Sequence, residues 1–216
     1  MNKNVSFSVL ESQIIKFTTV SAYSCMEEME KILEIIKNDP EFPNSILADH
    51  SIVDNLFNNA WTIVDRVFLS RKVLIKQNKS DIIKEFISST SALNMVRNKM
   101  DHIYQNIENM EKSKNQLPIL GVITCTFAPD GTSSSPRNLI LSNSDFIPGK
   151  KIRLQAVPPK EELYPLDRPV CHIKLHAFEQ TIDLFRVVSL LRQSTNALNV
   201  YESEFRTTDT RFATFI

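Results

Sequence analysis

Glycine is scarce in this chain of 216 residues, where it occurs only as Gly121, Gly131 and Gly149. A loop that cradles a phosphate needs clustered glycines, because they let backbone amides approach the ligand closely. Neither GxGxxG nor the pattern GxxxxGK followed by Ser or Thr occurs in the sequence. The sequence therefore argues against nucleotide binding by either of these loops.

Cysteine is also rare, and Cys25, Cys125 and Cys171 form neither a CxxC pair nor a paired framework. Reduced thiols in a cytoplasm fit this usage best. Long apolar runs are missing too, since stretches such as 117–122 are far too short to span a bilayer. The first residues lack the apolar core and cleavage site of a secretory signal. We therefore expect a cytoplasmic protein that does not engage a membrane.

Neither sign of charge is in excess, because Lys plus Arg and Asp plus Glu both total 25. A chain of zero net charge has no overall field that would hold a polyanion. Any contact with nucleic acid must therefore come from a local patch. The hydrophobic content of 42% and the charged content of 23% are those of an ordinary globular protein.

Helical spacing of apolar residues dominates the first half of the chain. A capping box at Ser8–Glu11 starts a helix that ends at Asn38–Pro40, and Thr18–Ala22 could kink it. A second capping-box pattern at Ser51–Asp54 starts a helix to about residue 77. Residues 78–81 provide a break and a new N-cap for a third helical stretch to about residue 111, which Ser88–Ser91 could divide. Asp65, among apolar neighbours of the second helix, is interpreted with Arg66 as a pair at the core boundary, and Trp61 as a core anchor.

The pattern changes to that of β-strands after residue 112. Residues 117–127, 139–141, 152–157 and 168–175 are strand candidates, and helical spacing returns from about 177 to 204. The predicted fold is mainly α (α+β overall), an antiparallel helix bundle with a small antiparallel β subdomain before the last helix. Residues 1–114 and 176–205 would form the bundle, 117–175 the β-rich insertion and 206–216 a tail.

One helical segment carries a concentration of chemically active side chains, Arg97, Asn98, His102 and Tyr104. Histidine titrates near neutral pH and can take a proton from a ribose 2′-hydroxyl or give one to a leaving oxygen. The planar fork of arginine can stabilise charge on a phosphorane. Asn98 could orient the substrate or the histidine, and Tyr104 could bind a phosphate or stack on a base. This set suits cleavage of RNA without a metal or other cofactor.

Helix geometry places these residues on different strips of the surface. Arg97 and Asp101, four residues apart, share a face and can form an ion pair, and Tyr104 is nearly aligned with Arg97. His102 lies on a strip offset from Arg97. The two side chains can converge only if the helix starts late or another surface contributes, including a second copy of the same helix across a two-fold axis.

The segment from Arg97 through Asn98 and His102 to Tyr104 resembles the R-x4-H-x-Y signature of HEPN domains, especially the toxins of HEPN/MNT toxin–antitoxin pairs. The resemblance implies a helical bundle that dimerises and a metal-independent endoribonuclease activity. It would make Arg97 and His102 catalytic, give Asn98 an assisting role, and make Tyr104 the residue that an antitoxin modifies with AMP. Asp101, which can pair with Arg97, is a further candidate for an assisting or substrate-binding role. RNA and an antitoxin protein are the implied partners. The β-rich stretch departs from the compact all-helical toxins.

Two other patterns have competing interpretations. His172 and His176 have HxxxH spacing, which would suit a metal on a helix, but the alternation of 168–175 favours a strand with His172, Lys174 and His176 on a solvated face. Basic residues between 150 and 174 could follow a phosphate backbone or protect a sheet edge. A non-catalytic interaction module, with the bundle as scaffold and the β insertion as partner-binding element, is the alternative to the ribonuclease.

Overall fold

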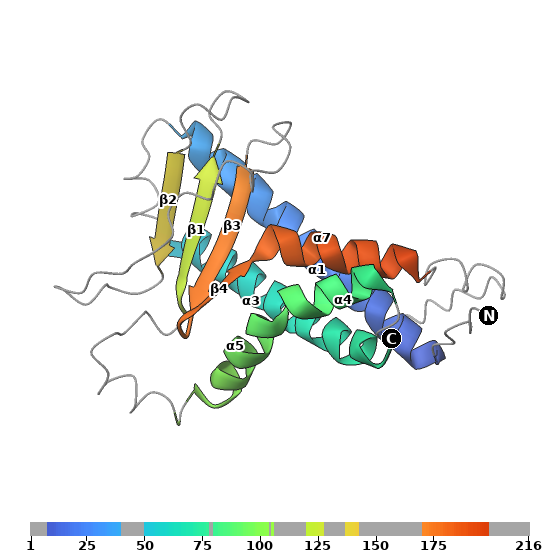
Figure 1. The fold of residues 1–216 in the computed structure, drawn as a ribbon. Coiled ribbons are helices and arrows are strands. Elements are labelled where there is room, and N and C mark those ends of the chain that lie inside the picture. Colours follow the sequence, from blue (N-terminus) through green and yellow to red (C-terminus); the bar gives the residue numbers. More distant parts are fainter. Residues whose placement is uncertain are drawn as a thin grey trace, which may run out of the picture.

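The computed structural model describes residues 8–39, 50–77, 80–103, 105, 120–127, 137–142 and 170–198. The helices are α1 (Val9–Asn38), α3 (His50–Leu74), the short 3-10 helix η1 (Ile75–Gln77), α4 (Asp81–Ser89), α5 (Ser91–Asp101) and α7 (Leu184–Ala197). The strands are β1 (Val122–Phe127), β2 (Arg137–Ser142), β3 (Val170–Ala177) and β4 (Gln180–Asp183). The fold is mainly helical with a small antiparallel sheet before the last helix, as the sequence predicts (Figure 1).

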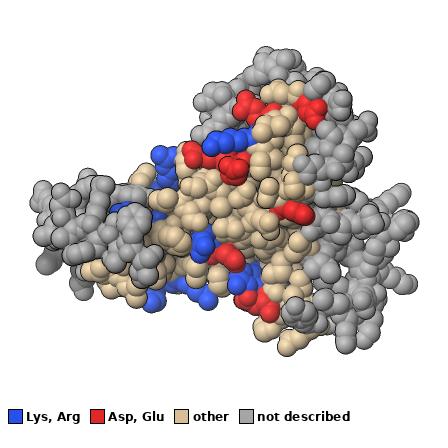
Figure 2. Space-filling view, turned by 180° about the vertical axis from the view of Figure 1, so that it is seen from behind, with Lys and Arg blue, Asp and Glu red and all other residues tan. Residues whose placement is uncertain are grey.

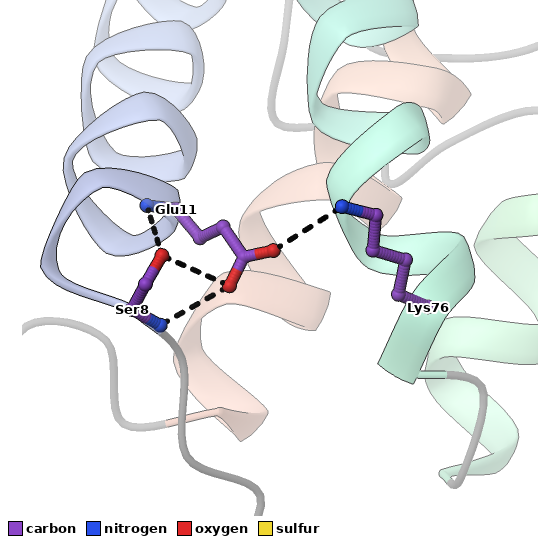
Figure 3. Close-up of polar contacts among 3 residues, drawn as sticks. All are labelled: Ser8, Glu11 and Lys76. Atoms are coloured by element: carbon purple, nitrogen blue, oxygen red, sulfur yellow. Dashed lines mark hydrogen bonds and ion pairs between the residues drawn. The ribbon is translucent and has the colours of Figure 1, made fainter.

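Helices α1 and α3 pack against each other over most of their length, and α7 packs against α1, α3 and α4. The capping box at the start of α1 forms as predicted, with the Glu11 amide donating to the Ser8 hydroxyl at 3.2 Å and the Ser8 amide donating to Glu11 at 3.1 Å. Lys76 of η1 reaches the same carboxylate at 3.5 Å (Figure 3). This contact ties the start of α1 to the end of α3. The capping box expected at Ser51 is wrong, because α3 already begins at His50.

The hydroxyl-rich segment in the middle of α1 does not break the helix. Thr18 and Thr19 donate their hydroxyls to carbonyls one turn earlier, each at 2.7 Å, so neither competes with the helical backbone bonds. The same hydroxyls meet Ser70 of α3 at 2.5 Å and Thr195 of α7 at 3.0 Å. A buried polar layer thus joins the three longest helices, since each of these side chains is less than 5% exposed.

The third helical stretch is divided as the sequence suggested. Helix α4 starts at the Ser80 N-cap, whose hydroxyl accepts from the Ile83 amide at 3.3 Å, and it ends at Thr90. The Thr90 hydroxyl donates to the Phe86 carbonyl at 2.6 Å, and α5 begins at the next residue. This break sets α5 at a new direction, so that the segment with Arg97 leaves the line of α4 (Figure 1).

The four strands lie side by side in the order β2-β1-β3-β4, all antiparallel, at one end of the bundle (Figure 1). One face of the sheet is apolar and joins the helical core; its buried members are Ile123, Cys125, Leu141, Ile173, Leu175 and Ile182. Trp61 of α3 is half-buried at this junction, where its ring nitrogen donates to the Leu120 carbonyl at 3.1 Å and its edge meets Phe178. The predicted core anchor therefore links α3 to the sheet.

Helix was predicted from about residue 177, and this prediction is wrong for its first residues. Phe178 and Glu179 adopt positive φ angles of 50° and 65° and form the tight turn between β3 and β4. Residues 180–183 then pair with β3, and only at Leu184 does α7 begin, with Asp183 as its N-cap. The four-residue spacing of Phe178 and Ile182 fits a helix, but Phe178 reaches the core from the turn and Ile182 reaches it from β4.

Several predictions lie outside the described residues: Tyr104, the strand candidate 152–157, most of the basic residues between 150 and 174, and the tail 206–216. Among the helices that the structure describes, none combines the length and apolar character needed to cross a membrane.

Candidate functional site

Arg97 lies on α5 and is held by two carboxylates from two helices. Its Nε donates to Asp65 Oδ1 of α3 at 2.5 Å, and its Nη1 donates to Asp101, one turn further along α5. The side chain of Arg97 is 26% exposed, and those of Asp65 and Asp101 are about half exposed. The predicted pair of Arg97 with Asp101 is confirmed. Asp65 pairs with Arg97 rather than with its neighbour Arg66.

Buried neighbours fix the backbone on both sides of this contact. Val64, directly before Asp65, and Val96, directly before Arg97, are both fully buried. Helices α3 and α5 pack together, and α5 also packs along β4. The two charged residues therefore project from the rim of a solid core, where the positions of their Cα atoms are fixed by packing.

His102 and Asn98 occupy the end of the same helix. Helix α5 ends at Asp101, and His102 is its C-cap, with its amide donating to the Asn98 carbonyl at 3.3 Å. The side chains of Asn98 and His102 are exposed. Within the described part of the chain, no hydrogen bond or ion pair joins Arg97 to His102. A single chain thus presents the arginine and the histidine at one helix end without a hydrogen bond or ion pair between them.

Charge on the face opposite to the view of Figure 1 is mixed. Basic and acidic side chains are interspersed there, with uncharged surface between them (Figure 2). Arg66 contacts α1, where it lies 4.9 Å over the Phe17 ring and donates to Ser21. The described surface in this view carries no broad basic field.

The polar side of β3 is buried, which corrects the predicted solvated face. His172, Lys174 and His176 are only 2%, 7% and 4% exposed. They alternate with the apolar residues that face the helices, so they lie on the other side of the sheet, together with buried Thr124 and Thr126 of β1. Alternation in sequence shows only that the two faces differ, and it cannot show that the polar face meets water.

A chain of hydrogen bonds organises this polar face. His176 bonds to the Thr124 hydroxyl through Nε2 at 2.8 Å and to the Thr181 hydroxyl through Nδ1 at 3.0 Å. Nδ1 of His172 lies 3.3 Å from Asp183, which also caps α7 by accepting from the Arg186 amide. Burial, and secondly the charge of Lys174, lowers the pKa of His176 to about 4. His176 is therefore neutral at physiological pH.

No metal centre is found among the residues that the structure describes, since no three of their His, Cys, Asp and Glu side chains gather in a way that could hold an ion. The HxxxH pair lies on a strand, where both rings of the pair are engaged as described above. The described thiols are not activated either, because burial raises the pKa of Cys125, and raises that of Cys25 by more than the charge of Arg66 lowers it.

Comparison with protein-family models, with curated proteins and with solved structures gives no match to this chain. Of the predicted site residues, the structure joins Arg97 to Asp101 and places Asn98 and His102 close by in the chain, while Tyr104 lies outside the described residues. Asp65 is the member of the site that sequence reasoning did not connect to Arg97.

Proposed function

We propose that the chain is a HEPN-like, metal-independent endoribonuclease that acts as a homodimer in the cytoplasm. The observation that carries the proposal is the exposed end of α5, where Arg97 is held by two carboxylates and His102 is open to solvent. A fixed arginine fork beside an accessible imidazole supplies charge stabilisation and proton transfer, which are the two needs of phosphodiester cleavage in RNA.

In the proposed reaction, the His102 imidazole takes the proton of a ribose 2′-hydroxyl, and the 2′-oxygen attacks the adjacent phosphorus. Arg97 stabilises the charge on the pentacoordinate phosphorane. The bond between phosphorus and the 5′-oxygen then breaks, and a second imidazole donates a proton to that oxygen. The products are one RNA end with a 2′,3′-cyclic phosphate and one with a 5′-hydroxyl.

The second imidazole comes from a second copy of the chain in this proposal. Each chain has one His102, and within the described residues no hydrogen bond or ion pair joins it to Arg97. A site completed across a two-fold axis would supply the second imidazole that one chain lacks. Asn98 assists by binding RNA. Tyr104 is the proposed point of modification by an antitoxin partner, and a toxin–antitoxin or defence role would follow.

The proposal is tested by incubating end-labelled RNA with the purified protein in EDTA and mapping the product ends. We expect cyclic phosphate ends with the wild type, and losses of at least about 100-fold in rate for Arg97→Ala and for His102→Ala. Lys99→Ala is the matched control, because Lys99 is an exposed cation on the same helix. His102→Ala should unfold within about 1 kcal/mol of the wild type, since His102 is exposed, and Arg97→Ala should remain folded, since Arg97 lies at the rim of the core. Cleavage that persists in both variants would disprove the assignment.

One observation favours the alternative, a non-catalytic interaction module. Leu10, Phe17 and Val20 on α1 are between 53% and 65% exposed, and such apolar side chains on one helix are typical of a surface that binds another protein. In that case neither the wild type nor His102→Ala cleaves RNA. Phe17→Ser, in contrast, should remove binding to a partner protein. The same set of variants therefore separates the two functions.

A further inference from the structure

We propose that Asp65 is a positioning residue for Arg97, and that it orients the guanidinium for the phosphate of RNA. The proposal rests on the ribonuclease function proposed above and assigns a role to a residue outside the motif. Asp65 lies 32 positions before Arg97 in the sequence and on a different helix, yet it makes the ion pair with Nε at 2.5 Å.

The geometry of the two contacts fixes the plane of the arginine fork. Asp65 engages Nε and Asp101 engages Nη1, and both nitrogens belong to one rigid planar group. The carboxylates come from different helices that pack on each other, so the plane is set by tertiary structure rather than by α5 alone. A guanidinium has more N–H donors than these two contacts use, and the others can serve a phosphate.

Stability is only part of what the pair contributes. Asp65 is 48% exposed, and exposed ion pairs contribute about 0 to 1 kcal/mol to the free energy of unfolding; the more buried Arg97, which is 26% exposed and shared by two carboxylates, places this pair at the upper end of that range or above it. Holding a long side chain in one orientation also costs side-chain entropy. The gain that remains is the orientation itself, which matters when the arginine must meet a charge that develops in a transition state.

The same arrangement predicts a split between binding and catalysis. Two carboxylates beside one guanidinium leave a local excess of negative charge, which opposes the RNA phosphate in the ground state. Replacing Asp65 by asparagine keeps the shape, relieves this repulsion and loosens the fork. We therefore expect Asp65→Asn to lower kcat by about ten-fold or more while KM stays the same or falls. A merely structural residue would not give this combination.

The first experiment measures kcat and KM for RNA cleavage in wild type, Asp65→Asn and Asp65→Glu. Glutamate restores the carboxylate and should recover part of the lost kcat. Asp81→Asn is the control, because it removes the carboxylate of another ion pair, that with Lys84 at 2.9 Å, which is more exposed and does not involve Arg97. It should behave like the wild type. An unchanged kcat in Asp65→Asn overturns the positioning role, as does a rise in KM with no change in kcat.

A second measurement tests the contact without relying on activity. The Nε–H proton of Arg97, observed by NMR, should exchange with water more slowly in the wild type and in Asp81→Asn than in Asp65→Asn. Equal exchange in all three proteins overturns the inference. A wild type that does not cleave RNA overturns the proposed function and the positioning role of Asp65 with it, whereas cleavage that is indifferent to Asp65 overturns the inference alone.

Discussion

His176 makes the stability of the protein depend on pH in a direction that the structure determines. The ring is buried on the polar face of the sheet, where hydroxyls of Thr124 and Thr181 bond to its two nitrogens. Burial, together with the charge of Lys174, lowers its pKa from 6.5 to about 4. The unfolded chain therefore binds a proton at this residue between pH 6.5 and pH 4, and the folded chain does not. The contribution of His176 to the free energy of unfolding is therefore fully present above pH 6.5 and is lost as the pH falls from 6.5 toward 4.

The size of this loss follows from the two pKa values. Each pH unit between them costs about 1.4 kcal/mol of unfolding free energy. Between pH 7 and pH 5 the contribution of His176 should therefore fall by about 2 kcal/mol. This is a large part of the 5 to 15 kcal/mol that holds a typical domain folded.

The assay is urea unfolding of the wild type and of His176→Gln at a series of pH values from 8 to 4.5. Glutamine does not titrate, and its amide can still bond to the two threonine hydroxyls. Carboxylates that protonate in this range affect both proteins equally, so the difference between the two curves isolates His176. The curves should be parallel above pH 7 and diverge below pH 6.5, with the wild type losing more. Parallel curves throughout would refute the reasoning.

Two further substitutions test the local structure by urea unfolding. Gly121 has a φ of 84°, and a Cβ added there would lie 2.3 Å from the His176 carbonyl oxygen. Gly121→Ala should therefore lower the free energy of unfolding by about 3 kcal/mol or more. A variant as stable as the wild type would contradict this geometry. Ser8→Ala removes the hydroxyl of the N-cap and should cost about 1 kcal/mol. The pKa of Glu11, held low by the Ser8 amide first and then by its hydroxyl and Lys76, should move back toward its usual value in an NMR titration of that variant.

The helices could be predicted well because their signals are local. The Ser8 capping box, the Ser80 N-cap and the division near Thr90 all depend on residues within one turn of each other. Helical spacing of apolar residues adds the face that packs. These signals need no knowledge of the rest of the chain, and the fold class follows from their order.

The turn between β3 and β4 could not be predicted because it lacks the usual residues. A tight hairpin with positive φ angles is normally marked by Asn or Gly, and this one has Phe178 and Glu179. The strained backbone of this turn lies where Phe178 packs on Trp61. That contact joins residues more than a hundred positions apart, so only the tertiary structure explains why the chain turns there.

Only part of the site could be predicted, because one of its contacts is local and the other depends on tertiary structure. Arg97 and Asp101 are one helical turn apart, so their pairing follows from the sequence. The contact of Arg97 with Asp65 depends on how α5 packs on α3, and the sequence contains only a weak sign of it, a charged residue among apolar neighbours. The buried polar face of β3 is the opposite case, where a pattern typical of a solvated strand conceals burial.

The two polar clusters differ in what they contribute, and this difference separates function from stability. Lys174, His172 and His176 are buried, so a change there that removes hydrogen-bonding groups disturbs a network inside the fold. The carboxylates around Arg97 are half exposed, and their removal should leave the fold nearly as stable as before. The site draws on two helices to hold one guanidinium, which is consistent with the positioning role proposed above. Variants at the end of α5 therefore test function, whereas variants on β3 test stability.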